Sequence, residues 1–267
     1  MTALRRRPAL AGIAAGVLLT AGTAGAADEV RTVAVRPGVT QSYILVRTVA
    51  RPTATVVLFA GGNGLLSLGS GRLTLGGNFL VRNRWRFARH GLLVAVLDAP
   101  SDRPNGLDGF RTTATHADDV RALLAALRGE AAAPVWLVGT SMGTVSAANA
   151  AARLTIGGPD GLVLSSTVTR QGRERPESVG DVRLGDIRVP TLVVHHREDA
   201  CRATPYADTT SLMRDLKAAP RRELLTFEGG APPQSGPCDA RSAHGFLGLD
   251  AEVVAAIARW ITAGPRP

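Results

Sequence analysis

A serine between two glycines is the first feature of this sequence with an evident chemical use. Residues 139–143 read Gly-Thr-Ser-Met-Gly, after a short apolar run and before an alanine-rich segment. This fits the G-x-S-x-G pattern, in which a tight turn from strand to helix presents the serine oxygen at the start of the helix. Side chains larger than hydrogen beside the serine would collide with the adjoining strand and helix. We therefore predict that Ser141 is a nucleophile, the alternative being a structural turn.

A nucleophilic serine needs a base, and in this pattern the acid and then the histidine follow the serine along the chain. The chain has five histidines. Only His244 lies between the last apolar run and the last helical segment. We predict that it is the general base, the alternative being a loop histidine bonded to the backbone. His90 and His116 precede the serine and are expected at the surface or at helix ends, while His195 and His196 end a strand ahead of any candidate acid.

The acid is expected just after the apolar run 190–196, where Glu198 and Asp199 stand. We choose Asp199, because in similar sequences the acid follows the strand end by a few residues. Glu198 is interpreted as its solvated neighbour. Asp98 has the wrong chain order and is expected to shape the pocket floor or a loop, and Asp208 is expected to be an exposed helix residue.

Acyl transfer also needs hydrogen-bond donors for the oxyanion that develops on the substrate. One predicted donor is the backbone N–H of Met142, the residue after the serine. The other is expected in the loop 61–64, Gly-Gly-Asn-Gly, which follows an apolar run. Within this loop the N–H of Asn63 is the first choice and that of Gly62 the second. The alternative is that these four residues form a plain turn.

The N-terminal segment has the pattern of a secretory signal peptide. Residues 5–7 are arginines, residues 9–19 are mostly apolar, and small residues lead up to Ala26. We expect cleavage after Ala26, which leaves 27–267 as one secreted or periplasmic domain. A membrane anchor is the alternative, but the apolar run is shorter than the roughly 20 residues that a spanning helix needs. The consecutive arginines leave both the general and the twin-arginine export routes open.

Composition narrows the possible partners of the mature chain. Removing 26 of the 267 residues leaves 241, enough for one domain with a large core. The formal charge of +9 falls to +6 without the three leader arginines, and Lys217 is the only lysine. No block of basic residues appears, so nucleic-acid binding is not expected. No later apolar run reaches membrane-spanning length, so stable membrane insertion of the mature chain is not expected either.

The two cysteines are expected to form a disulfide, because an exported protein meets an oxidising compartment. The alternative is a pair of unpaired buried thiols. Cys201 comes two residues after Asp199, and Cys238 comes six residues before His244. A bridge would therefore connect the loops that carry the predicted acid and base. In the chain-entropy model, closing a loop of this length stabilises the fold by at most about 4 kcal/mol.

Strand and helix signals alternate along the mature chain. Segments 30–35 and 43–49 read as extended. The later runs are apolar throughout, which is typical of buried parallel strands; they are 53–62, 91–100, 135–139, 161–167, 190–196 and 223–230. Residues 115–129 and 250–264 have the apolar spacing of helices. Thr115 is the expected cap of the first of these helices, with Asp118 and Asp119 in its first turn.

Two further segments bear on the substrate. Residues 65–77 alternate apolar and polar residues around Gly69-Ser70-Gly71, which predicts a β-hairpin that overhangs the acyl pocket. The usual place of a lid, 168–188, holds only a short, polar, arginine-rich segment. A large lipase-type lid is therefore not expected.

Together these motifs resemble the α/β-hydrolase superfamily, over nearly all of the mature chain. The resemblance implies a central, mostly parallel sheet flanked by helices, and a triad of Ser141, His244 and Asp199 that acts through an acyl-enzyme. It implies no metal and no organic cofactor. A serine at this turn argues against two enzyme classes of the superfamily. Dehalogenases have an aspartate at the position of the nucleophile, and dienelactone hydrolases have a cysteine there.

The sequence therefore predicts an exported hydrolase of carboxylic esters with small or medium acyl groups. Esterases, lipases, thioesterases and some peptidases share these motifs. A serine peptidase or a thioesterase is the alternative within the enzymes. A catalytically idle binding protein on the same fold is the alternative outside them.

Overall fold

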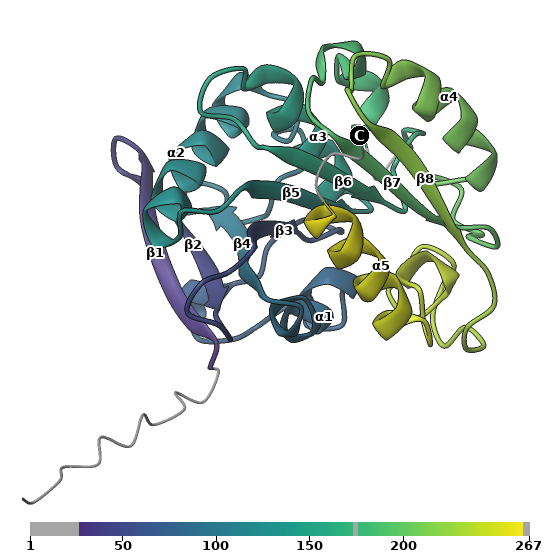
Figure 1. Ribbon diagram of the computed structural model, residues 1–267, viewed down its shortest axis with the longest axis horizontal. Coiled ribbons are helices and arrows are strands. Elements are labelled where there is room, and N and C mark those ends of the chain that lie inside the picture. Colours follow the sequence, from purple (N-terminus) through teal and green to yellow (C-terminus); the bar gives the residue numbers. More distant parts are fainter. Residues whose placement is uncertain (1–26, 173–175, 264–267) are drawn as a thin grey trace, which may run out of the picture.

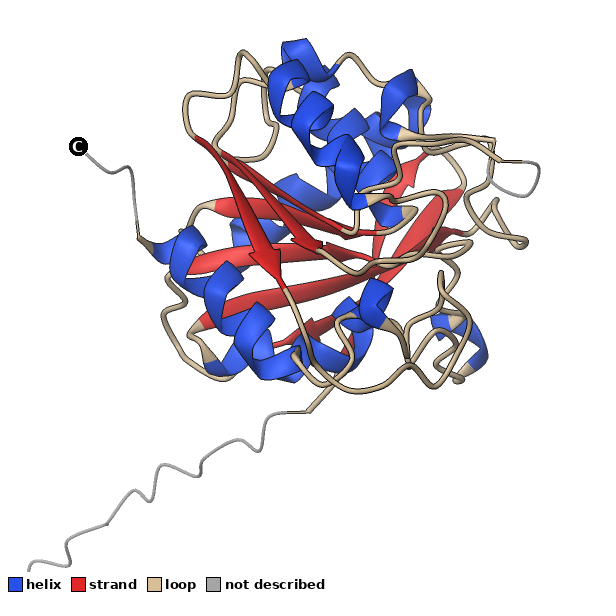
Figure 2. Ribbon diagram, turned by 90° about the vertical axis from the view of Figure 1, so that its right-hand side faces the viewer, coloured by secondary structure: helices blue, strands red, loops and turns tan. Residues whose placement is uncertain are grey.

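The computed structural model describes residues 27–172 and 176–263. The signal peptide expected at residues 1–26 lies outside the described residues. One twisted sheet runs through the centre of the molecule, with helices packed on both of its faces (Figures 1 and 2). This is the three-layer, single-domain arrangement expected from the alternation of strand and helix signals.

The sheet has eight strands in the order β1-β2-β4-β3-β5-β6-β7-β8. From β4 to β8 all neighbouring strands are parallel, while β1 pairs with β2, and β2 with β4, in antiparallel fashion. The sheet is therefore mostly parallel, as predicted. The strands are β1 Glu29–Arg36, β2 Val39–Val46, β3 Ala54–Phe59, β4 Leu92–Pro100, β5 Val135–Thr140, β6 Gly161–Ser165, β7 Thr191–His196 and β8 Arg222–Phe227.

Two apolar cores fill the space between the sheet and its helices. One lies between the sheet and α2, α3 and α4, and the other between the sheet and α1 and α5. Since parallel neighbours require crossover connections, α1, α2, α3 and α4 each carry the chain from the end of one strand to the start of the next, whereas α5 follows the last strand. The helices are α1 Phe79–Arg89, α2 Ala114–Glu130, α3 Gly143–Arg153, α4 Thr209–Asp215 and α5 Asp250–Thr262.

Two strands differ from their sequence-based description: β2, next to the edge strand β1, and β8, which forms the other edge of the sheet. β2 begins at Val39, earlier than expected, because Gly38 with φ +71° closes a tight turn after β1. β8 is only partly buried, although its sequence is apolar enough for a buried strand. An edge strand has a neighbour on one side alone, so its apolar residues retain some contact with solvent.

The start of α2 lies before the predicted cap. Thr113, and not Thr115, is the N-cap residue, and its side chain accepts a hydrogen bond from the backbone N–H of His116 at 3.1 Å. Asp118 and Asp119 consequently lie beyond the first turn. Asp119 is buried, and its carboxylate pairs with Arg36 at 2.7 Å instead of interacting with the helix end. The periodicity identified the helix, but two threonines close together made its first residue ambiguous.

The predicted β-hairpin at 65–77 is wrong. The segment instead contains the short 3-10 helix η1, Leu68–Ser70, and a series of turns, with one strand-like hydrogen bond from the N–H of Thr74 to the carbonyl oxygen of Leu66 at 2.9 Å. The apolar alternation has another cause. Leu66 and Leu68 are buried in the core, where the Asp98 carboxylate accepts their backbone N–H groups.

The carboxyl ends of the parallel strands bring the predicted site residues to one edge of the sheet. The loop 61–64 follows β3, Ser141 follows β5 and Asp199 follows β7, while His244 lies between β8 and α5. In open α/β sheets, ligands bind at this carboxyl edge. The topology therefore places residues from four separate parts of the chain within reach of one another.

Candidate active site

Ser141 occupies a strained turn. Its φ is +52°, in the left-handed region that residues other than glycine rarely adopt. A Cβ on Gly139 would lie 2.5 Å from the carbonyl oxygen of Gly143, and a Cβ on Gly143 would lie 2.1 Å from that of Phe59. Neither position has room for a side chain. The glycines therefore have the steric purpose predicted for them, and the turn between β5 and α3 is as tight as the motif requires.

The loop after β3 passes directly beside this turn. Phe59 and Gly139 are paired neighbours in β3 and β5, so both strands end at the same level. A Cβ on Gly61 would lie 2.8 Å from the Cβ of Ser141. Glycine at this position thus lets the backbone of the loop approach the serine closely.

His244 and Asp199 form a buried hydrogen-bonded pair. The Nδ1 of His244 donates to the Oδ2 of Asp199 at 2.9 Å. His244 lies in the 3-10 helix η5, Ala243–Gly245, and Asp199 lies in the turn after β7. The carboxylate also accepts the backbone N–H of Cys201 at 3.0 Å and the hydroxyl of Thr204 at 2.8 Å. Of the two neighbouring candidates, Glu198 and Asp199, the structure thus brings the predicted acid, Asp199, to the histidine.

Burial and these partners act on the Asp199 carboxylate in opposite directions. Burial raises its pKa, but the hydrogen bond and charge of His244, with the bonds from Cys201 and Thr204, lower the pKa below its ordinary value. The carboxylate is therefore ionised at neutral pH and holds a proton on Nδ1 of the imidazole. The Nε2 of His244 has no hydrogen-bond partner among the described residues. That nitrogen is left to exchange a proton with a nucleophile or a ligand.

Ser141 and His244 line one small cavity of about 120 Å³. Since one water molecule takes about 30 Å³ in the liquid, this space equals that of about four waters. Asp199 lies behind His244 and is not part of the lining. Three of the other lining residues are Gly61, Gly62 and Thr140. Leu75 comes from the segment 65–77, called the insertion from here on, and Asn78 and Phe79 come from the start of α1. Cys238, Ala240 and Gly245 come from the loop that carries His244.

The candidate oxyanion donors lie at different distances from this cavity. Met142 is the N-cap residue of α3 and follows the serine directly. Gly62 lines the cavity, whereas neither Met142 nor Asn63 is among its lining residues. The side chain of Asn63 accepts the N–H of Leu65 at 3.2 Å and thus closes its own turn. The structure therefore favours Gly62, the second choice, over Asn63 as the partner of Met142.

Arg111 is a buried residue that sequence reasoning missed. Its guanidinium donates to the carbonyl oxygen of Gly62 at 2.7 Å and to the hydroxyl of Ser146 in α3 at 3.1 Å. Burial lowers its pKa to about 10, although the nearby charge of Glu177 raises it. The arginine thus connects the candidate oxyanion loop to the helix behind the nucleophile. A single loop arginine in an arginine-rich sequence carries no signal of this role.

Arg82 in α1 has a comparable position beside the loop of His244. It donates to the carbonyl oxygens of Gly245 at 2.6 Å, Ala240 at 3.1 Å and Gly77 at 2.8 Å, and it pairs with Asp250 at 2.7 Å. It therefore holds the end of the insertion against the loop that carries the histidine. No helix was expected at the position of α1, so this residue was also missed.

None of the other histidines lines the cavity, although the Nε2 of His195 lies 3.7 Å from the Oδ2 of Asp199. His90 is exposed at the C-terminal end of α1, as expected. His116 lies at a helix end, as expected, in the first turn of α2, but it is fully buried; burial, with the charge of Arg111, lowers its pKa to about 3. His195 and His196 each contact a backbone carbonyl oxygen through Nε2, at 2.8 Å and 3.0 Å.

The remaining acidic candidates have structural positions. Glu198 is exposed, as expected for a solvated neighbour. Asp98 holds the insertion through its backbone N–H groups and so shapes a loop, as expected. Asp208 lies in a helix, as expected, namely the 3-10 helix η4, Tyr206–Asp208; it is half-buried and not exposed, because it accepts hydrogen bonds from Thr169 and Arg170.

The disulfide between Cys201 and Cys238 is present, so the alternative of two free thiols is wrong. Cys201 donates its backbone N–H to Asp199, and Cys238 lines the cavity that contains Ser141 and His244. The bridge thus joins the turn of the acid to the loop of the histidine, as the spacing predicted.

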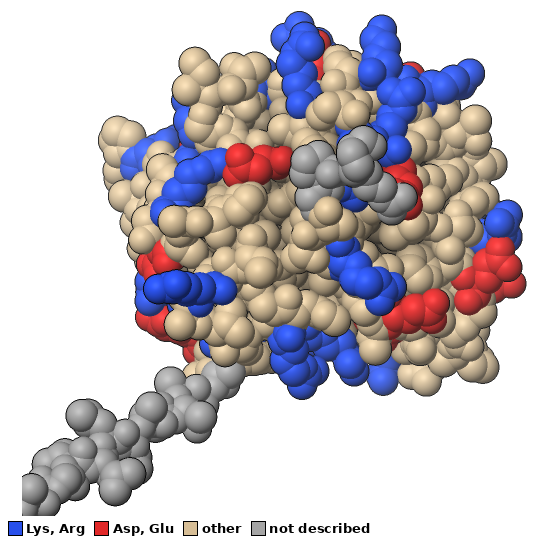
Figure 3. All heavy atoms as spheres, in the orientation of Figure 1, with Lys and Arg blue, Asp and Glu red and all other residues tan. Residues whose placement is uncertain are grey.

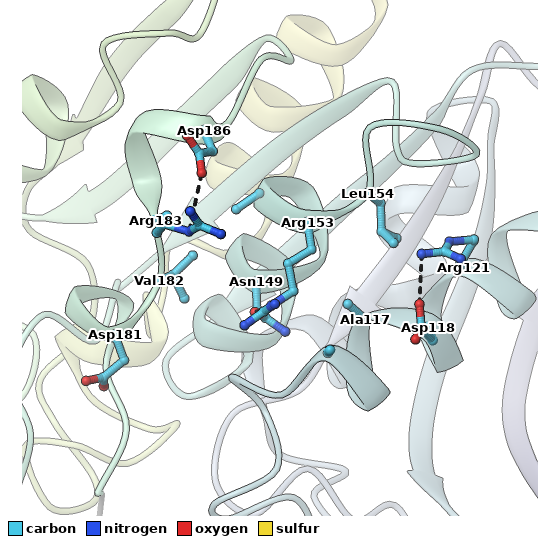
Figure 4. A pocket seen from close by; sticks show the side chains of 12 residues that line it. Ala117, Asp118, Arg121, Asn149, Arg153, Leu154, Asp181, Val182, Arg183 and Asp186 are labelled. Carbon is cyan, nitrogen blue, oxygen red and sulfur yellow. Dashed lines mark hydrogen bonds and ion pairs between the residues drawn. The ribbon is translucent and has the colours of Figure 1, made fainter.

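A larger hollow of about 420 Å³ lies elsewhere, between α2, α3 and the segment 181–186 (Figure 4). Figure 4 shows two ion pairs among its charged side chains: Arg121 with Asp118 at 2.8 Å, and Arg183 with Asp186 at 3.5 Å. It contains none of the residues predicted to perform chemistry. The smaller cavity is the candidate active site, because only there do a strained serine and a histidine with a free nitrogen meet.

The rest of the described surface carries charges that are mixed in sign. On the face drawn in Figure 3, basic side chains spread around the rim with acidic side chains between them at several points. Within residues 27–172 and 176–263, every helix is too short or too polar to traverse a bilayer. The same residues contain no group of three His, Cys, Asp or Glu side chains placed to bind a metal ion.

Comparison with solved structures defines the fold class. A lid-free α/β serine hydrolase from Xanthomonas campestris superposes with a TM-score of 0.55 at 18% identity, over 89% of this chain and 97% of that chain. A thermophilic esterase from Thermogutta terrifontis gives 0.58 at 18%, over 90% and 94%. A dienelactone hydrolase from Anabaena variabilis gives 0.61 at 14%, over 90% and 99%. The chain therefore has the α/β-hydrolase fold, with no large lid.

Sequence comparison adds no closer relative. No protein-family model matches the chain, and no curated protein does. At the identities of the solved structures, the likeness extends to the fold alone. What the site does must therefore be argued from its own residues.

The disulfide provides a first test of the site's geometry. The double variant Cys201→Ala/Cys238→Ala should lose about 2–4 kcal/mol of stability. It should also have a lower kcat toward any substrate of this site, because a displacement of about 1 Å can cost on the order of 100-fold in rate. Turnover should be measured well below the melting temperature, with circular dichroism to confirm folding. An unchanged kcat, or alkylation of both cysteines in the native protein, would contradict this coupling.

Proposed function

We propose that this protein is an exported serine hydrolase that cleaves carboxylic esters with small or medium acyl groups. One observation carries the proposal: Ser141 in its strained turn and the free Nε2 of His244 face the same cavity, with Asp199 bonded behind the histidine. A structural turn needs neither the histidine nor the buried carboxylate. The hydrolase and esterase neighbours in fold support the same reading.

In the proposed mechanism, Ser141 Oγ attacks the carbonyl carbon of the ester while His244 Nε2 takes the serine proton. Asp199 keeps the imidazole oriented and stabilises its positive charge. The backbone N–H groups of Met142 and Gly62 donate to the oxyanion, with Asn63 as the alternative second donor. His244 then gives this proton to the leaving alcohol. In the second half of the reaction, water attacks the acyl-enzyme while His244 takes a proton from it, and His244 then returns the proton to Ser141.

The small size of the cavity and the position of Leu75 in its wall favour substrates with small acyl groups. This residue lines the cavity with its backbone in the left-handed region, at φ +54°. A Cβ on Gly62 would lie 3.6 Å from its Cδ2, so the leucine packs against the candidate oxyanion loop. Asp98 holds the preceding part of the insertion in place. The insertion thus covers the acyl side of the cavity, the role first inferred for a hairpin.

Three alternatives remain distinct in their chemistry. A thioesterase or a serine peptidase would use the same triad on another acyl derivative. A catalytically idle binding protein would leave Ser141 unreactive, but its backbone strain would then serve no purpose. A panel of esters, thioesters and peptide amides separates the first two from the ester hydrolase.

Export belongs to the proposal as well. The leader pattern at 1–26 is one support, and the disulfide is an independent one, because such bonds persist mainly in oxidising compartments. We therefore assign the mature chain, from residue 27, to the periplasm or to the outside of the cell.

The nucleophile is tested by Ser141→Ala. The variant should fold like the wild type, because only one hydroxyl is removed, and its kcat on acetyl and butyryl esters should fall by on the order of 10⁴-fold or more. Wild type and variant should be assayed on the full panel of acyl derivatives. Wild-type turnover by the variant, or the absence of ester turnover by the wild type, would overturn the proposed function.

The insertion is tested by Leu75→Ala, with Leu73→Ala as the matched control. Leu75 lines the cavity, whereas Leu73, in the same insertion, is 39% exposed and does not. Removing the Leu75 side chain should raise the rate on octanoyl relative to acetyl esters several-fold, because it removes the wall that limits chain length. The control should keep the wild-type ratio. An identical chain-length profile in both variants would exclude Leu75 from the acyl site.

A further inference from the structure

Asn78 is the last residue before α1, and the oxygen and the nitrogen of its side-chain amide have different surroundings. Its Oδ1 accepts the backbone N–H of Leu80 at 3.1 Å, which makes it the N-cap of the helix. An N-cap needs an acceptor, so the oxygen must face the helix. The amide nitrogen, which only donates, is then directed away from the helix.

The opposite side of Asn78 is the candidate active site. Asn78 lines the cavity together with Ser141 and His244. A Cβ on Gly61 would lie 2.8 Å from the Cβ of Ser141 and 3.3 Å from the Nδ2 of Asn78, so both groups border the same side of that glycine. Among the described residues, the side chain of Asn78 makes its hydrogen bond through Oδ1, and Nδ2 donates none. An amide donor with no partner among those residues therefore stands beside the nucleophile.

The backbone around Asn78 is fixed at both ends. Its N–H donates to the carbonyl oxygen of Leu75 at 2.8 Å, and its own carbonyl oxygen accepts the N–H of Arg82 at 2.9 Å. The Arg82 side chain bonds to the carbonyl oxygens of Gly77 and of Gly245, next to His244. The amide nitrogen is thus held in place before any ligand arrives, which is the condition for electrostatic catalysis.

We propose that Asn78 Nδ2 is a third donor of the oxyanion hole, an inference that rests on the proposed function. When Ser141 Oγ bonds to the carbonyl carbon, the π electrons of the carbonyl move to its oxygen and the serine proton moves to His244 Nε2. The Asn78 N–H then donates a hydrogen bond to that negative oxygen and transfers no proton. Such charge-assisted bonds are stronger in the transition state than to the neutral carbonyl, so they raise kcat.

The two functions of Asn78 can be separated by substitution. Asn78→Ser retains an oxygen that caps the helix but ends too close to the backbone to reach the cavity. Asn78→Ala loses both the cap and the donor. We expect both variants to lose about 10-fold or more in kcat with little change in KM, somewhat less than the loss on removing a backbone donor. Only the alanine variant should also show a lower Tm, because only it lacks the cap.

A second measurement reports on the oxyanion without turnover. Phenylboronic acid forms a tetrahedral adduct with an active-site serine, so its affinity depends on the donors around the adduct. Both variants should bind it more weakly by a factor similar to their loss in kcat. An Asn78 that only caps the helix would leave the boronate affinity of the serine variant unchanged.

The outcomes distinguish this inference from the proposed function. If turnover depends on Ser141 but Asn78→Ser keeps wild-type kcat and boronate affinity, the donor role is wrong and the proposed function stands. If kcat falls only in the variant with a lowered Tm, Asn78 acts through the helix alone and the inference is overturned. If the wild type cleaves no acyl derivative, both are overturned.

Discussion

The turn at Ser141 exists because α3 packs directly against the backbone of β3. Gly143 lies so close to the carbonyl oxygen of Phe59 that no side chain fits between them, and Gly139 is equally close to the first turn of α3. The chain between these two glycines has one way to turn, which forces Ser141 to a φ of +52°. Strain of this kind costs on the order of 1–3 kcal/mol, and the large cores on both faces of the sheet maintain it.

The other site residues can act only on a serine that this turn presents to them. The loops that carry these residues are each held by contacts of their own. The disulfide and the bond to Asp199 hold the loop of His244 from one side, and Arg82 holds it from the other. Buried Arg111 holds the loop after β3 through Gly62. Three loops that are far apart in sequence therefore keep their positions without a ligand, as expected of a preorganised site.

The sequence predicted what local spacing determines. The strand-turn-helix at Ser141, the histidine after the last strand and the cysteine pairing all follow from residue type and chain order. The prediction failed at residues 65–77, where the leucines alternate as they would in a strand. Two of them are buried for another reason: Leu66 is a core residue in a loop, and Leu68 is a core residue at the start of the 3-10 helix η1. The prediction also missed Arg111 and Asn78, because a buried cation and a capping amide become recognisable only when distant segments meet.

The central claim is that Ser141 forms a covalent acyl-enzyme with the help of His244. Its most direct test is the reaction of the purified mature protein with a fluorophosphonate, followed by mass spectrometry of the intact protein and of its peptides. The account predicts one adduct per chain, on the peptide that contains Ser141, and a strongly slowed reaction in His244→Ala. Absence of an adduct from the folded wild type, or an adduct on another residue, would contradict it.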